Sequence, residues 1–239
     1  MTDNEIITTL DFDSLLCKLS KDEDLSPEEV NALERCITAN IKGPREKRNL
    51  EDLYAALTVV SKSKLQHLSY LAEMCLDVPD PLLVCLALET LAIEWHIGSN
   101  YEERLIQFAL GVPSDHDGDI RECALRCLGV LLNEGNLDLT KKENLTQTEL
   151  RLISILVSVL EESATDEPFW STALGILEET LGEKNKSEHN LADQLLAKVK
   201  KIIHKSPPKS GKTTTAGESN ITQESTSRPG SMSSSGGLR

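Results

Sequence analysis

One short motif recurs along the chain: Ala-Leu-x-x-Leu, each time with an aspartate seven residues before its alanine. The copies begin at Ala87, Ala124 and Ala173 and are led by Asp80, Asp117 and Asp166. A weaker copy has Asn49 seven residues before Ala56. Recurring supersecondary units form stacked architectures in which each unit packs on its neighbours. The recurrence therefore predicts stacked helices, and such stacks mostly present binding surfaces rather than catalytic sites.

The composition favours helices over strands. Aromatic residues make up only 3% of the 239 residues, whereas sandwiches and barrels need alternating β-branched and aromatic residues. The longest apolar stretch, residues 150–160, is shorter than the roughly 18 residues of a membrane span, and Arg151 interrupts it. The first residues lack the basic start and apolar stretch of a signal peptide. We therefore expect an all-α, cytoplasmic protein that does not enter a membrane.

Helical periodicity, together with residues that start or stop helices, divides the chain into four predicted regions. Ser26-Pro27 with Glu29 is typical of a helix start, and it lies in an N-terminal helical cap over residues 1–48. Nearly continuous helical pattern then predicts a repeat region over residues 49–186. An amphipathic helix over residues 187–205 caps the last repeat. Residues 206–239 are rich in Ser, Thr and Gly, with few apolar side chains, which predicts a disordered tail.

The charge is unevenly distributed between the body and the tail. Residues 198–239 contain eight Lys or Arg and two Glu, so of the net charge of −14 they account for +6 and residues 1–197 for −20. Phosphates would be repelled by such a body, which argues against nucleic-acid binding. We expect a protein partner with a basic patch.

The leading aspartates and the motif itself have a structural explanation. A carboxylate at the start of a helix accepts hydrogen bonds from backbone N–H groups that have no partner within the helix. We therefore predict that Asp80, Asp117 and Asp166 are helix caps. The alanines allow neighbouring helices to approach closely, and the leucines fill the space between them.

No pattern in the sequence predicts a catalytic, metal or cofactor site. The loop from Asp115 to Asp119 resembles a calcium loop, but the twelfth position, where an EF-hand has a bidentate Glu, is Arg126. The six cysteines form no Cys-x-x-Cys pair, so reduced structural thiols are favoured over metal or redox roles. The five histidines show no recognisable spacing to a nucleophile. We expect a non-enzymatic protein.

The polar positions on the second helices of the repeats are the predicted binding surface. These positions are Glu89, Glu94, Glu122 and Arg126, joined by Trp95. Trp95 ends a predicted helix, so both an exposed binding anchor and a core position are open to it. Trp170 lies in the apolar face of its helix, which favours packing in the core.

The repeated segments resemble HEAT repeats. The match is best over residues 117–128, where Asp117, Ile120, Arg121, Ala124, Leu125 and Leu128 all occur at the family's offsets. Elsewhere Val84 and Trp170 replace the arginine, and successive alanines are 31, 37 and 49 residues apart. The resemblance implies an α-α superhelix, a short HEAT-like solenoid, that acts as a protein-binding scaffold or adaptor.

Two alternative functions also come from this resemblance. The first is a toxin-neutralising immunity protein, because residues 95–111 and the loop that follows resemble bacterial HEAT-type proteins. The second is a HEAT-type lyase-like protein acting on a chromophore, which would need a polar pocket; His96 and Asp115 are the residues to test for it. The sequence gives no indication of oligomeric state.

Overall fold

The computed structural model describes residues 10–113, 115–134, 145–162, 167–181, 194, 196–201 and 203. The chain divides into residues 1–207 and 208–239, and every described residue belongs to the first unit. The regular elements of these residues are all helices, with no strand among them, which confirms the all-α prediction. None of the described helices combines the length and apolar character needed to cross a membrane.

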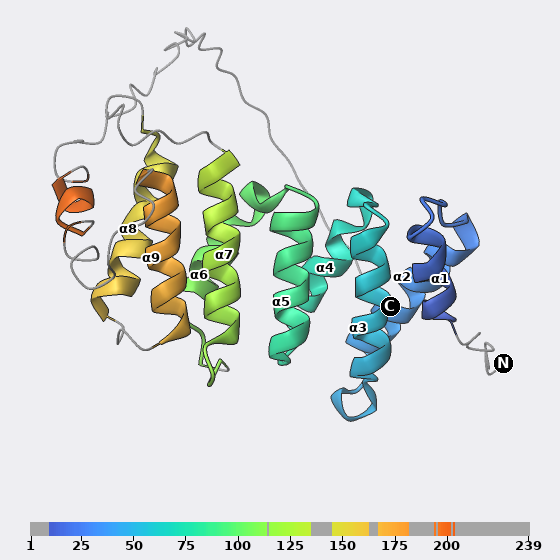
Figure 1. Ribbon diagram of the computed structural model, residues 1–239. Helices are drawn as coiled ribbons and strands as arrows, with labels where there is room; N and C mark the ends of the chain where they lie inside the picture. Colours follow the sequence, from blue (N-terminus) through green and yellow to red (C-terminus); the bar gives the residue numbers. More distant parts are fainter. Residues whose placement is uncertain are drawn as a thin grey trace, which may run out of the picture. The chain divides into compact units, whose positions relative to one another are not determined.

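The α-helices follow one another along the chain (Figure 1). They are α1 (Phe12–Leu19), α2 (Pro27–Lys42), α3 (Leu50–Lys62), α4 (Ser69–Cys75), α5 (Pro81–Glu89), α6 (Glu102–Ala109), α7 (Asp119–Glu134), α8 (Gln147–Glu162) and α9 (Pro168–Leu181). Short 3₁₀ turns lie at Arg45–Lys47, Gln66–Leu68 and Gly98–Tyr101.

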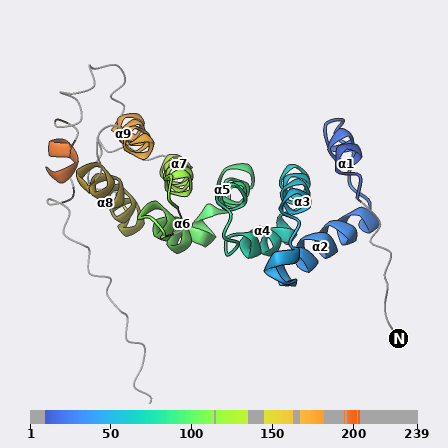
Figure 2. The same ribbon diagram turned by 90° about the horizontal axis from the view of Figure 1, so that it is seen from below.

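The helices form two rows (Figure 2). The odd-numbered row contains α1, α3, α5, α7 and α9, and each of these packs on the next in the row. The even-numbered row contains α2, α4, α6 and α8. Contacts such as those of α2 with α3 and α6 with α7 join the two rows. The apolar faces of both rows meet in one core of buried side chains, most of them Leu, Val, Ile and Ala.

The repeated motif has the same place in four helices of the odd-numbered row. Its alanine is fully buried in each copy, at Ala56 in α3, Ala87 in α5, Ala124 in α7 and Ala173 in α9. The last apolar residues of the copies, among them Leu128 and Leu177, are buried as well. All four alanines therefore lie in the core, where a small side chain allows neighbouring helices to approach closely.

Polar side chains begin most of these helices. Ser26 and Glu29 form a complete capping box at α2. Asn49 accepts a hydrogen bond from the Asp52 amide at α3, and Asp80 accepts one from the Leu83 amide at α5, over 2.9 Å. Such bonds satisfy backbone donors that the helix leaves unpaired.

The cap of α7 differs from the prediction. Asp115, rather than Asp117, accepts hydrogen bonds from the Ile120 and Arg121 amides, over 3.1 and 2.8 Å. The loop reaches back because Gly118, at a φ of +81°, turns the chain before the helix starts. The assignment of this cap to Asp117 is therefore wrong, while Asp166 lies outside the described residues.

Arg121, in the motif copy that matches HEAT repeats best, contacts two helices besides its own. Arg121 on α7 donates from Nε to the Ala109 carbonyl at the end of α6, over 3.0 Å. Its guanidinium also lies over the ring of Phe169 on α9, 4.4 Å from the ring centre. Arg121 thus has a structural role in the packing of α7.

The end of α5 departs from the expected continuous helix. Thr90–Glu94 is a π-helical turn, in which the Trp95 amide donates to the Thr90 carbonyl over 3.0 Å. His96 follows with a φ of +55°, a left-handed conformation uncommon outside glycine. The wider turn redirects the chain immediately before Trp95.

The predicted capping helix is only partly described. Residues 194, 196–201 and 203 are helical, and Val199 is buried against the core. Lys200 forms an ion pair with Glu161 at the end of α8. The predicted disordered tail, residues 206–239, lies outside the described residues.

Candidate protein-binding surface

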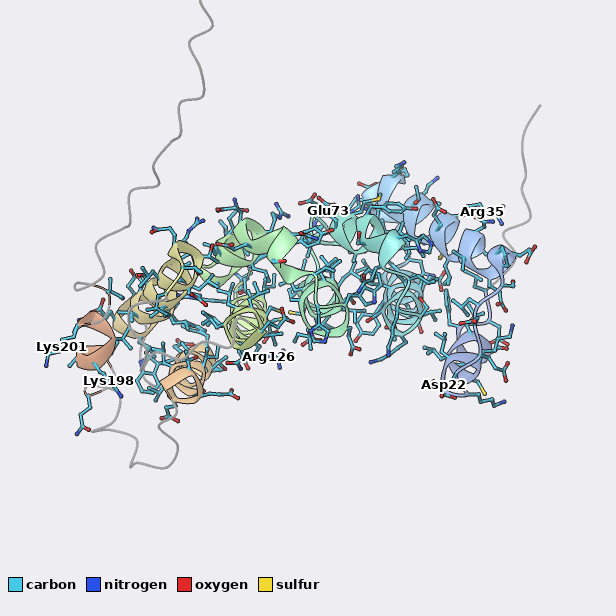
Figure 3. The ribbon with its side chains drawn as sticks, turned by 90° about the horizontal axis from the view of Figure 1, so that it is seen from above. Asp22, Arg35, Glu73, Arg126, Lys198 and Lys201 are labelled. Atoms are coloured by element: carbon cyan, nitrogen blue, oxygen red, sulfur yellow. The ribbon has the colours of Figure 1, made fainter. Side chains whose placement is uncertain are left out.

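The surface of the odd-numbered row that points away from the even-numbered row is called the outer face here. Side chains on this face recur every three or four residues, because a helix turns about 100° per residue. Figure 3 shows Arg126 on the outer face, and Arg35 and Glu73 on the opposite side of the molecule. The outer face contains most of the predicted binding residues.

The predicted polar binding residues bridge neighbouring helices. Arg126 on α7 donates to Glu89 on α5 over 2.8 Å. Lys62 on α3 donates to Glu94, in the π-helical turn, over 2.9 Å. The Thr172 hydroxyl on α9 donates to Glu122 on α7 over 3.5 Å. These polar contacts therefore link adjacent helices, and the side chains of both ion pairs remain partly exposed at the surface.

A similar arrangement joins helices of the even-numbered row. Arg104 on α6 donates to Asp77, which follows α4, over 2.6 Å. Arg151 on α8 forms an ion pair with Glu103 on α6, and its hydrogen bond lowers the pKa of the Glu103 carboxyl. Ion pairs across neighbouring helices are thus common to both rows.

Trp95 is a core residue and not an exposed anchor. Its side chain is 2% exposed, and its indole Nε1 donates to the Ser61 carbonyl at the end of α3, over 3.0 Å. Gln66 donates to the Trp95 carbonyl over 2.8 Å. The binding-anchor interpretation of Trp95 is therefore wrong. Trp170, the other tryptophan, is half-buried and donates to the Leu160 carbonyl over 3.3 Å.

Three cysteines line the contact between α5 and α7. Cys85 is partly exposed, whereas Cys123 and Cys127 are buried. The Cys123 thiol donates to the Cys85 carbonyl over 3.5 Å. A side-chain interaction with Cys123, together with burial, raises the pKa of the Cys85 thiol. This thiol therefore stays protonated and is a poor nucleophile. These cysteines are packing residues, as is Cys75 in α4.

An apolar stripe on α5 was not predicted from the sequence. Leu82 is 67% exposed on the outer face, and Cys85 and Leu86 beside it are only partly buried. The opposite side of α5 is buried through Leu83, Val84, Ala87 and Leu88. An α-helix that is apolar all round is normally covered on every side. The sequence already contained this information, because Leu82, Cys85 and Leu86 are apolar residues outside the buried face of α5.

The groups considered for catalysis lie apart. His96 Nδ1 lies 2.5 Å from Glu134 Oε1, at the end of α7. Asp115 caps the start of the same helix, which is about 22 Å away at 1.5 Å per residue. They cannot form one site. Within the described part of the chain, no group of three or more His, Cys, Asp or Glu side chains is placed to hold a metal ion.

Comparisons with protein-family models, with curated proteins and with solved structures return no match. The resemblance to HEAT repeats thus depends on the residue pattern and on the place of that pattern in the four helices.

Proposed function

We propose that the protein is a short HEAT-like solenoid that acts as a non-enzymatic scaffold or adaptor and binds another protein on its outer face. The exposed apolar stripe of α5, with Leu82 at its centre, is the observation that supports this most strongly. Soluble proteins seldom leave connected apolar side chains in water unless a partner covers them.

The polar residues around the stripe support the same surface. Glu89, Glu94, Glu122 and Arg126 already hold helices together, so their role in binding is to surround the contact and to attract an oppositely charged partner. The energy of binding would come from the apolar side chains that lose their water.

Site-resolved crosslinking tests this proposal. A photoreactive amino acid replaces Leu82 on the outer face, and in a second variant it replaces Leu110, which is 52% exposed at the end of α6. We expect protein adducts, identified by mass spectrometry, at position 82 and few at position 110. Equal labelling at the two positions, or no protein adduct at position 82, would contradict the proposal.

A further inference from the structure

Exposed apolar side chains lie on α3 and α5, on the sides of these helices that face each other at the outer face. In the repeated motif, the residue two before the alanine faces the next helix of the row, since Cys85 donates to a carbonyl of α7 and Glu122 accepts from a hydroxyl of α9. Tyr54 holds this position in α3, two residues before Ala56, so it faces α5. The Tyr54 side chain is 46% exposed, and that of Leu50, one turn earlier, is 43% exposed.

The matching side of α5 is apolar as well. Cys85 and Glu89 face α7, since the Cys85 thiol donates to the Asp119 carbonyl and Glu89 binds Arg126. Leu86 is about 100° round the helix from Cys85 and therefore faces α3, with Leu82 between them. We call Leu50, Tyr54, Leu82 and Leu86 the α3/α5 seam.

Acidic residues outnumber basic residues on the outer face to which this seam belongs. The outer stripes of α3, α5 and α7, with the π-helical turn, contain five acidic side chains, Glu51, Glu89, Glu94, Asp119 and Glu122, and two basic ones, Lys62 and Arg126. The difference is −3, and both cations already pair with carboxylates of the same face. A partner that covers the apolar seam must therefore meet carboxylates at its edges.

Two occupants fit this surface poorly. A second copy would bring two acidic outer faces together, which like charges oppose. The basic end of the chain has the right charge, but residues 205–239 contain only three large apolar side chains, Ile221, Met232 and Leu238, widely spaced. Such a segment cannot fill an apolar seam.

We propose that the α3/α5 seam binds an amphipathic helix of a basic partner protein, an inference that depends on the proposed scaffold function. The seam belongs to two helices that pack side by side, and a third helix can pack a ridge of apolar side chains across them. Its apolar side chains contact Tyr54, Leu82 and Leu86. Lysine or arginine side chains on its flanks face Glu51 and Glu89.

A synthetic peptide is the probe for this inference. It has about 18 residues, with leucine at helical spacing on one face and lysine elsewhere, and its binding to the full chain is followed by fluorescence anisotropy. Two matched peptides replace lysine by glutamate or shuffle the leucines without changing the composition. We expect only the first peptide to bind tightly, because it alone has both the apolar stripe and the positive charge.

Substitutions locate the peptide on the molecule. Leu82→Ser and Tyr54→Ser should each weaken binding at least about tenfold, in line with the loss of a buried apolar contact. Leu110→Ser removes another exposed leucine, outside the seam, and should change binding less than about twofold. Equal binding of the shuffled peptide, or equal weakening by Leu110→Ser, would overturn the inference.

Peptide binding and crosslinking at position 82 can give different results, which distinguish this inference from the scaffold proposal. If the lysine peptide fails to bind while crosslinking at position 82 still captures a protein, the basic helical occupant is wrong and the scaffold stands. If position 82 also captures nothing, both are wrong.

Discussion

At the scale of single residues, equivalent sequence positions do not have equivalent roles. Asp80 caps α5. Asp117 lies at the same distance from its own motif, but Asp115, two residues earlier, caps α7 instead. Both aspartates precede the same helix, so the sequence alone cannot choose between them. The path of the loop, fixed by Gly118, decides.

Alanine substitutions of three aspartates should separate these roles. Asp80→Ala and Asp115→Ala each remove a cap and should lower the free energy of unfolding by about 1 kcal/mol, within a range of roughly 0.5–2 kcal/mol. Asp117→Ala should change it by less than about 0.5 kcal/mol. Urea unfolding measures all three, and a large loss in Asp117→Ala would contradict the corrected cap.

Cys75 makes stability depend on pH in the alkaline range. Burial raises the pKa of its thiol from 9.0 to about 12, so the unfolded chain loses this proton first. Stability from the buried thiol is complete below pH 9 and falls as the pH rises from about 9 to about 12, by up to about 1.4 kcal/mol per pH unit.

Replacing this thiol should flatten the pH dependence. The Cys75→Ala variant should lose less stability than the native chain between pH 9 and pH 10.5, roughly, over which the thiol of the unfolded chain ionises. Cys17→Ala, at an exposed position, is the control and should lose as much stability over this pH range as the native chain. Urea unfolding at several pH values gives the comparison, and parallel curves for the two variants would refute the assignment.

At the scale of helices, the positions of the elements were largely predictable. Apolar periodicity indicated α2, α3, α7 and α8, and a polar cap indicated the start of α2, because both signals are local in the sequence. The π-helical turn at Thr90–Glu94 was not predicted, because its residues, among them the apolar Leu91 and Ala92, fit the pattern of an α-helix equally well. Its position depends on the packing of Trp95 against Ser61, 34 residues away.

The candidate surface was predictable only in part. The outer positions of the second helices follow from periodicity, but the partners of Glu89 and Glu94 are on other helices and cannot be identified from one sequence. The burial of Trp95 likewise depends on a residue of another helix, Ser61 in α3. The apolar residues of α5 were visible in the sequence, yet their exposure depends on what covers the helix.

Gly129 at the contact of α7 with α9 and Gly175 on the exposed side of α9 should respond to alanine substitution in opposite directions. An added Cβ at Gly129 would lie 2.9 Å from Ile176 Cγ1, whereas one at Gly175 would have no heavy atom within 4 Å. Gly175→Ala should therefore stabilise α9 by about 0.5–1 kcal/mol, the usual gain of alanine within a helix.

Gly129→Ala should lack this gain. Crowding in a packed core costs about 1–3 kcal/mol, which outweighs the gain in helix propensity. We expect this variant to unfold at lower urea concentration than the native chain and Gly175→Ala at higher concentration. Stabilisation by both substitutions would show that the two helices have room to separate.

At the scale of the whole molecule, the charge distribution opposes folding. Residues 1–197 have a net charge of −20, and bringing them together increases their mutual repulsion. The exposed ion pairs between helices are weak and are themselves screened by salt. The excess of negative charge should therefore dominate the response to ionic strength.

Sodium chloride should stabilise the protein at neutral pH. Raising the concentration from about 0.02 to about 0.3 M shortens the Debye length from more than 20 Å to less than 10 Å, which reduces the repulsion between carboxylates. Thermal unfolding at several concentrations measures the effect. A decrease in the midpoint temperature with added salt would mean that the ion pairs across helices outweigh the net charge.

The contacts of each odd-numbered helix with its nearest helices in both rows have a mechanical consequence. A force applied to the two ends of residues 10–203 loads the contacts between helices one after another. Stacked repeats whose contacts are between neighbours can separate in parts. Extension in an optical trap should then proceed in several small steps, with the helices at the ends released before α5 and α7.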